Sequence, residues 1–320
     1  MSRVAVDILP PALPAPRWLA RPGLYMELSK AKLSALVVFT AAAGWLMAPT
    51  AAQTAQAQAR GPANWVTLAG VLAGVALAAF GANSLNQVLE AGRDALMRRT
   101  RHRPLPAGRI GRGEAVAWGL IASAAGLFLL AGFGNMLTAG LGLANILIYL
   151  LIYTPLKPRT PANTLVGAVV GALPPIMGWT AATGSVGTGA CVLGAILFIW
   201  QVPHFLALAW FNRADYAAGG FRMLPSIDPS GRITGTLVLV HSLALPPITL
   251  ALTLMGLTDG FYAAGALVLG LWLAWLALQL RRRCDQENAR RMFLASVMYL
   301  PLLLVMMTAD RLLLGTVPVH

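Results

Sequence analysis

The sequence predicts an all-α, polytopic membrane protein, built as a bundle of nine transmembrane helices. Of the 320 residues, 58% are apolar and only 11% are charged, and the mean hydropathy is +0.69. Soluble domains contain about 45–50% apolar and about 25% charged residues. The apolar residues form continuous runs of roughly 20, the length of a bilayer-spanning helix. This composition excludes a soluble globular domain and a disordered chain, and two cysteines cannot build a disulfide scaffold.

Nine apolar runs are the candidate membrane helices. Several contain Gly or Pro, which membrane helices tolerate where neighbouring helices satisfy the freed backbone groups. We expect a single transmembrane domain over residues 30–311. A proline-interrupted N-terminal tail of residues 1–29 would precede it, and a short C-terminal tail of residues 312–320 would follow it. The nine runs lie at about 33–49, 65–85, 114–132, 136–153, 164–183, 189–209, 233–256, 261–280 and 292–310.

The basic residues predict the orientation of the helices. The residues before the first span and the loops after the second, fourth, sixth and eighth spans contain all 24 Lys and Arg residues except Arg60 and Arg311. Because basic residues accumulate in cytoplasmic loops, we expect a cytoplasmic N-terminus and an outside C-terminus, in a plasma or inner membrane. The same rule explains the net charge of +13 without a nucleic acid partner.

Three oxygen-bearing side chains follow one another where the second span enters its long cytoplasmic loop. Asn86, Glu90 and Asp94 are spaced by four residues, so a helix places them on one face. Carboxylates at a membrane boundary are costly unless they are paired or coordinated. Mg²⁺ prefers such hard oxygen ligands together with substrate phosphates. The line is therefore either a magnesium site or a helix end that is ion-paired with nearby arginines.

Further polar residues in the cytoplasmic loops are candidates for binding an anion. Arg99 and Arg103 follow the acidic line, and guanidinium groups bind phosphate oxygens through paired N–H donors. The positive-inside rule would also explain each arginine taken alone. Lys157 lies in the loop after the fourth span, and the loop after the sixth span brings Arg213 and the carboxylate of Asp215 to the same side.

Four segments resemble the UbiA superfamily of intramembrane prenyltransferases. The resemblance extends over about residues 83–225, whereas the ends of the chain match only in hydropathy. The ALMxRTxxRPLPxG and WQxPHF patterns are specific to the branch of the superfamily that farnesylates heme. The segments are the run from Asn86 to Gly108, YTPLKPRTPAN (153–163), GALPPIMGW (171–179) and WQVPHFLALAWFNRADY (200–216) with MLP (223–225).

The resemblance implies a nine-helix bundle with a lateral, lipid-facing cavity beneath the cytoplasmic loops. Its implied substrates are farnesyl diphosphate and heme b, with Mg²⁺ as activator, and a downstream heme A synthase is a candidate partner. Farnesyl diphosphate would ionise to an allylic cation, a heme vinyl group would attack it, and water would capture the resulting cation to give heme O. The implied residues are Asn86, Glu90, Asp94 and Asp215 for Mg²⁺ and catalysis; Arg99, Arg103, Lys157, Arg213 and Asn163 for the diphosphate; and His204, Tyr153 and Tyr216 for the heme or the prenyl chain.

Heme as an implied substrate gives the histidines two alternative roles. A buried histidine is usually a satisfied core residue, but imidazole is also a common axial ligand of heme iron. His204 lies in the inner third of the sixth span and within the WQxPHF pattern, so both interpretations stay open. His241 lies outside any such pattern, and we expect a structural role for it.

Two positions depart from the family pattern, and two other functions stay open. Gly92 and Ala214 stand where many relatives have acidic residues, which leaves the number of Mg²⁺ ions undecided. A prenyltransferase acting on an aromatic quinone precursor would use the same acidic residues. A transporter is a remote alternative, because transporters usually place polar groups near the bilayer midplane and the acids here gather at the cytoplasmic face.

Overall fold

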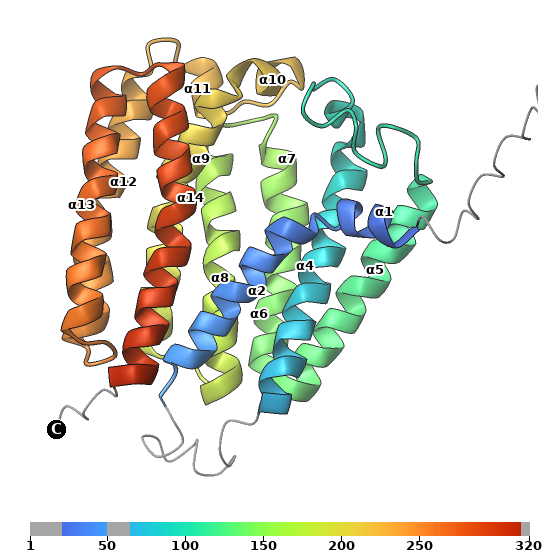
Figure 1. Ribbon diagram of the computed structural model, residues 1–320. Helices are drawn as coiled ribbons and strands as arrows, with labels where there is room; N and C mark the ends of the chain where they lie inside the picture. The colour runs from blue at the N-terminus through green and yellow to red at the C-terminus, as the bar shows by residue number, and fades with distance from the viewer. Residues whose placement is uncertain (1–20, 50–64, 315–320) are drawn as a thin grey trace, which may run out of the picture.

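The computed structural model describes residues 21–49 and 65–314, and every regular element in them is a helix. Eight helices are long and apolar enough to cross a membrane. The helices α1 (Arg21–Leu28) and α2 (Ala31–Met47) meet at a bend of 65° and make a ninth candidate when they are counted as one span. The predicted all-α bundle is therefore confirmed over the described residues, with its first span bent (Figure 1).

The other eight spans agree closely with the predicted apolar runs. Short π-helical stretches follow α5, α6 and α14. The short helix α7 (Thr154–Leu156) then completes the span that begins with α6. The eight spans are α4 (Trp65–Asp94), α5 with its extension (Arg112–Gly134), α6 through α7 (Met136–Leu156), α8 (Asn163–Thr183), α9 (Thr188–Phe211), α12 (Arg232–Leu254), α13 (Gly260–Arg282) and α14 with part of its extension (Gln286–Leu312).

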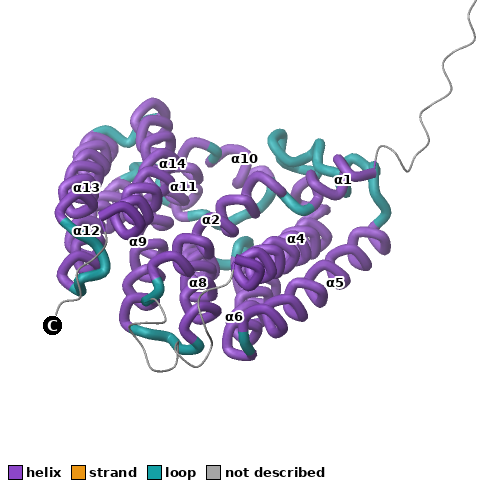
Figure 2. The backbone as a smooth tube through the Cα atoms, turned by 60° about the horizontal axis from the view of Figure 1, so that its bottom comes forward, coloured by secondary structure: helices purple, strands orange, loops and turns teal. Residues whose placement is uncertain are grey.

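The spans pack around α8 and α9, which lie between two groups of helices. Helices α12, α13 and α14 form one group, and α4, α5 and α6 form the other, while α2 crosses between them (Figure 2). The largest hydrophobic core lies between α9 and the C-terminal group. The loop after α4 and the short helices α10 (Arg213–Ala218) and α11 (Leu224–Ile227) gather at one end of the bundle (Figure 1).

The N-terminal segment differs from the predicted tail, because residues 21–28 form α1. Pro22 stands in the first turn of this helix, where a missing N–H costs nothing. Leu28 is fully buried and packs with Val88 of α4 and Ile110. Part of the predicted tail is therefore helical. Residues 1–20 and 315–320 of the predicted tails and the predicted outside residue Arg60 lie outside the described residues.

Helices α2 and α8 approach each other closely at two glycines. A Cβ atom on Gly178 would overlap the carbonyl oxygen of Ala41, and one on Gly44 would overlap that of Pro175. Small residues permit such backbone contact between membrane helices, where packing replaces the hydrophobic effect as the driving force. This crossing fixes α2 against α8, and both helices line the cavity described below.

The start of α12 is fixed by a buried carboxylate. Asp228 accepts hydrogen bonds from the backbone N–H and the hydroxyl of Thr234, at 2.8 and 2.9 Å, and from Ser230 Oγ at 3.0 Å. Burial would raise the pKa of Asp228, but these hydrogen bonds outweigh it and hold the pKa below its usual value. The bonds satisfy part of the helix's free N-terminal donors.

Candidate active site

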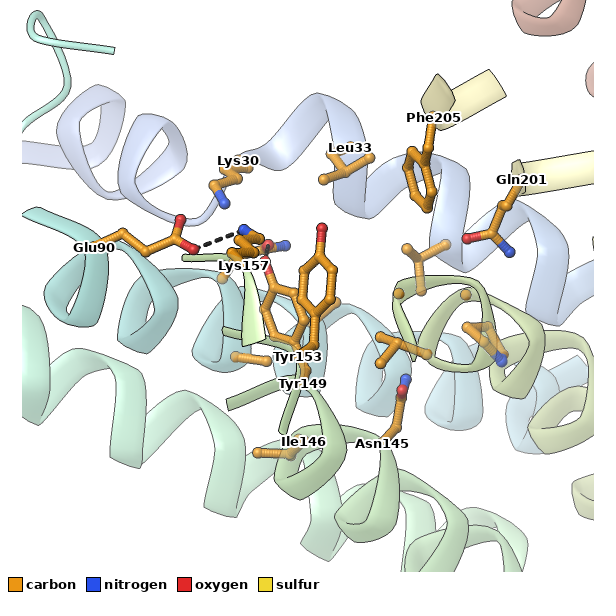
Figure 3. Close-up of a pocket in the computed structure, with 18 of the residues that line it drawn as sticks. Lys30, Leu33, Glu90, Asn145, Ile146, Tyr149, Tyr153, Lys157, Gln201 and Phe205 are labelled. Atoms are coloured by element: carbon orange, nitrogen blue, oxygen red, sulfur yellow. Dashed lines mark hydrogen bonds and ion pairs between the residues drawn. The ribbon is translucent and has the colours of Figure 1, made fainter. Parts of the chain in front are cut away.

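A cavity of about 330 Å³ lies within the bundle, with walls from α2, α4, α6, α8 and α9. This volume falls in the usual range of ligand pockets. Figure 3 shows Lys30, Glu90 and Lys157 together at one end, with Tyr149 and Tyr153 beside them and Phe205 and Gln201 at the other end. Much of the remaining wall is apolar, from residues such as Val75, Ala78, Ile146, Pro174 and Met177.

The acidic line on α4 lies at the charged end, and each of its members already has a cationic partner. Asn86, Glu90 and Asp94 are 0%, 5% and 1% exposed. Glu90 pairs with Lys157 at 2.7 Å, and Asp94 pairs with Arg103 at 2.7 Å. Glu90 and Asp94 line the cavity, whereas Asn86 lies one turn earlier in α4 and outside the lining. The helix thus brings Glu90 and Asp94 together at the cavity and leaves Asn86 beside it.

Lys30 is a cavity residue that the sequence did not reveal. Its Nζ donates to Asn86 Oδ1 at 2.9 Å, and the side chain reaches the charged end of the cavity (Figure 3). Its φ of 49° makes it the single non-glycine residue with positive φ in the described segments. Such a conformation is strained for a side chain with Cβ. No sequence signal marks the bend that turns Lys30 inward, so the charge pattern alone groups it with the basic residues that precede the first span.

Lys157, in the loop between α7 and α8, is held in its charged form. Its Nζ lies 4.5 Å from the centre of the Tyr153 ring in addition to its ion pair with Glu90. Burial alone would lower the pKa of Lys157, but the effects of Tyr153 and Glu90 outweigh it, and the pKa stands above its usual value. The cavity therefore keeps this positive charge at neutral pH.

The loop after α4 is tied to α10 through Asp215 and Tyr216. Asp215 Oδ2 accepts a hydrogen bond of 3.0 Å from the backbone N–H of Arg99, and the Arg99 guanidinium lies 5.6 Å from the Tyr216 ring centre. Arg99 and Tyr216 line the cavity, but Asp215 lines a shallower hollow beside it. The prediction that Asp215 shares one site with the α4 acids is thus not met in this arrangement, because its carboxylate is used to fix the loop.

Two predicted diphosphate ligands lie outside the cavity lining. Arg213 is exposed and stacks on Trp210, with its guanidinium carbon 4.8 Å from the ring centre. Asn163 is buried at the start of α8, where its amide N–H₂ donates to the carbonyls of Thr160 and Arg222 at 2.6 and 3.3 Å. Both side chains fasten the loops that cover the cavity, and neither faces its interior.

Of the three residues predicted to contact the heme or the prenyl chain, two line the cavity and one does not. Tyr153 and Tyr216 line the cavity. His204 lies at the interface of α9 with α14, where its Nδ1 is 2.9 Å from Ser296 Oγ. It is not a lining residue, although the next residue, Phe205, is one. His204 therefore faces α14 and not the cavity.

The donor set at the charged end fits Mg²⁺ bound together with a phosphate. Asp94 Oδ1 is buried and has no hydrogen-bond partner, so it is an unused acceptor beside the cavity. The described residues contain no group of three or more His, Cys, Asp and Glu side chains arranged around one point. Two carboxylates and the Asn86 amide cannot form an all-protein cage, but Mg²⁺ typically binds one or two carboxylates and completes its shell with waters and substrate phosphates.

Residues 46–297 match the UbiA prenyltransferase family, and the chain belongs to this family. It is 44% identical to the mitochondrial protoheme IX farnesyltransferase of Arabidopsis thaliana, over 87% of the chain and 62% of that relative. It is 38% identical to the protoheme IX farnesyltransferase of Solibacter usitatus, over 90% of the chain and 98% of that relative. The chain therefore spans less than two thirds of the plant relative and nearly all of the bacterial one.

Solved structures share the fold at low sequence identity. A digeranylgeranylglyceryl phosphate synthase superposes with a TM-score of 0.73 and 14% identity, covering 91% of this chain and 98% of its own. A UbiA homolog from Archaeoglobus fulgidus bound to GPP and Mg²⁺ gives 0.63 and 13%, covering 89% and 99%. The resemblance inferred from the four motifs is thus confirmed, and the chain is a multi-span member of a prenyltransferase family.

Proposed function

We propose that the chain transfers the farnesyl group of farnesyl diphosphate to heme b, giving heme O and diphosphate with the addition of one water. One observation carries the donor half of this proposal. Glu90 and Asp94, each paired with a cation, lie at one end of a cavity whose walls are otherwise largely apolar. This polarity matches a molecule with an anionic head and a hydrocarbon tail. The relatives named protoheme IX farnesyltransferase support heme as the acceptor.

The cations of the cavity would bind the diphosphate and stabilise it as it leaves. Lys157 and Arg103 would exchange their carboxylate partners for phosphate oxygens, and Lys30 and Arg99 would bind from the rim. Charge that develops on the leaving oxygen is then met by donors already in position. Mg²⁺, held by Asn86, Glu90 and Asp94, would add Lewis-acid stabilisation of the same oxygens; its use by this family is supported by the Archaeoglobus fulgidus homolog.

The bond changes follow from ionisation of the allylic C–O bond. Its electron pair leaves with the diphosphate, and the π electrons of a heme vinyl group form the new C–C bond to the farnesyl cation. A water molecule then adds its oxygen to the resulting cation and loses a proton. The largely apolar walls near Tyr153 would keep other water from the farnesyl cation, so a single water must reach the acceptor side.

The predicted site residues outside the cavity lining would act by holding the loops in place. Asp215, Arg213 and Asn163 would hold the loops around the diphosphate, and Asp215 would turn to the metal only if its bond to Arg99 opened. Tyr153 and Tyr216 would contact the prenyl chain or the heme.

We propose a plasma or inner membrane location, with the N-terminus cytoplasmic and the C-terminus outside, and delivery of the product to a heme A synthase.

The test is a product assay on purified protein in detergent. Heme b, farnesyl diphosphate and Mg²⁺ are incubated with the protein, and the extracted hemes are analysed by mass. We expect farnesylated, hydrated heme that disappears with Asp94→Asn or with a chelator and persists with Asp285→Asn. Asp285 is a matched control because it also lies near the loops, where it caps α14. Prenylation of an aromatic acid without a heme product would overturn heme as the acceptor.

A further inference from the structure

Two amide side chains lie at the end of the cavity that is opposite to Glu90 and Lys157. Asn145 of α6 and Gln201 of α9 both line the cavity, and Figure 3 shows them away from the charged end. Both residues belong to membrane-spanning helices. Polar groups are costly there unless they are paired, and those that occur usually have a function. The wall between the two ends is largely apolar, so the diphosphate site does not account for these amides.

Asn145 has an unused hydrogen-bond acceptor. Its Oδ1 is buried and has no hydrogen-bond partner among the described residues. Figure 3 shows the amide group directed toward the cavity. Buried polar atoms of proteins are nearly always paired with protein or with water. A hydrocarbon chain carries no hydrogen-bond donor, so a prenyl tail in contact with Asn145 cannot satisfy this oxygen.

The amide of Gln201 is held by backbone carbonyls and presents its oxygen. Its Nε2 donates to the carbonyl oxygen of Leu197 at 3.0 Å and to that of Ala168 on α8 at 3.4 Å. No donor in the described part of the chain bonds its Oε1. A Cβ atom on Gly171 would lie 2.0 Å from this Oε1, so the glycine leaves the space that the amide fills. Gly171 begins the GALPPIMGW segment and Gln201 belongs to the WQxPHF pattern, so two of the four motif segments meet at this end of the cavity.

We propose that Asn145 and Gln201 form a polar end wall that limits the prenyl chain of the donor to about the length of farnesyl. This inference rests on the proposed function, in which a prenyl diphosphate is the donor. With its diphosphate bound near Lys157, the chain runs along the apolar walls toward the two amides. A further isoprene unit would exclude water from Oδ1 and Oε1 and offer no hydrogen bond in return, which costs binding free energy.

The test is a competition between farnesyl and geranylgeranyl diphosphate. Equal amounts of both are incubated with heme b, Mg²⁺ and purified protein in detergent, and the masses of the extracted hemes are measured. The product ratio gives the ratio of the two kcat/KM values, which does not depend on how much of a variant is folded. We expect wild-type protein to favour farnesyl by about tenfold or more.

Two variants replace each amide with an apolar side chain of similar size. Asn145→Leu and Gln201→Leu should each reduce the preference for farnesyl severalfold, and the double variant should abolish it. Gln279→Leu is the matched control, because Gln279 is a half-buried amide of the membrane helix α13 that does not line the cavity. It should leave the preference unchanged.

Three results would overturn the proposal. The first is a preference that stays unchanged in both leucine variants, or that wild-type protein does not show. The second is a gain of the longer donor in Asn145→Ala without a gain in Asn145→Leu, because space and not polarity would then set the limit. The third is prenylated heme without the added water in the leucine variants, which would assign the amides to the reacting water.

Binding of unreactive donors separates this inference from the proposed function. The thiolodiphosphate analogues of farnesyl and geranylgeranyl diphosphate keep the chain and the anionic head but ionise far less readily, so their affinities report on the cavity without heme or turnover. If wild-type protein prefers the farnesyl analogue and Asn145→Leu does not, while no prenylated heme forms, the end wall stands and heme as the acceptor fails. If farnesylated heme forms but both proteins bind the two analogues with the same ratio, the proposed function stands and the end wall fails.

Discussion

Replacing Lys157 with Met would leave a buried carboxylate without its partner. The pair it forms with Glu90 is 2.7 Å long, and the two side chains are only 15% and 6% exposed. Removing one member of a buried pair costs about 3–5 kcal/mol, whereas exposed pairs contribute about 0–1 kcal/mol. Because Lys30 remains close to the carboxylate, we expect Lys157→Met to lower the free energy of unfolding by about 3 kcal/mol, the lower end of that range.

A double variant isolates the pair from other effects of the substitution. Glu90→Gln removes the charge that Lys157→Met leaves uncompensated, so the double variant should recover about 2 kcal/mol of the loss, within the usual range of coupling energies. Denaturant unfolding in detergent, followed by tryptophan fluorescence, measures all three variants against the wild type. A loss below about 1 kcal/mol for Lys157→Met, or strictly additive losses in the double variant, would refute this account of the pair.

Three further predictions concern other parts of the bundle. Asp228→Asn should lower the free energy of unfolding by about 1–3 kcal/mol. Because the pKa of Asp228 is lowered in the folded protein, its stabilising effect relative to Asn should be complete above about pH 4 and should shrink as the pH falls further. A difference in denaturant titrations that does not depend on pH would contradict this. Gly178→Ala should lower the free energy of unfolding by about 3 kcal/mol or more through overpacking. Gly140→Ala, whose Cβ meets nothing within 4 Å, should change the melting temperature little. Equal shifts in melting temperature for the two variants would contradict the close α2–α8 contact. Lys30→Met should raise the KM for farnesyl diphosphate and leave heme affinity unchanged, as measured by steady-state kinetics and heme titration, and an unchanged KM would exclude Lys30 from the diphosphate site.

The membrane spans could be predicted because the bilayer imposes its length on each of them. The arrangement on α4 could also be predicted, because a continuous helix places residues spaced by four, such as Asn86, Glu90 and Asp94, on one face. The bend at Lys30 could not be predicted, because a left-handed residue between two helices depends on how α1 packs against α4. That packing is a tertiary contact with no pattern of its own in the sequence.

The loop residues were the least predictable part of the site. Arg103 and Arg213 are the same residue type on the same side of the membrane, yet one pairs with a cavity carboxylate and the other stacks on Trp210. Membership of a motif identified both but did not distinguish them, because loop geometry is decided by contacts such as Asp215 with Arg99. For His204, the position along its helix could be predicted from the sequence, but the face it occupies depends on its contact with Ser296 of α14.

The balance of charge in the cavity also sets an order of events. Two carboxylates, Glu90 and Asp94, face an excess of cations, so the cavity is net positive before any substrate arrives. A lone Mg²⁺ would have to displace Lys157 and Arg103 from their carboxylates against this field. A prenyl diphosphate is attracted by the same field and offers both cations new partners, which frees the carboxylates. Glu90 and Asp94 would therefore become free to hold Mg²⁺ only once a diphosphate has bound Lys157 and Arg103, and both ion pairs would close again when the diphosphate leaves.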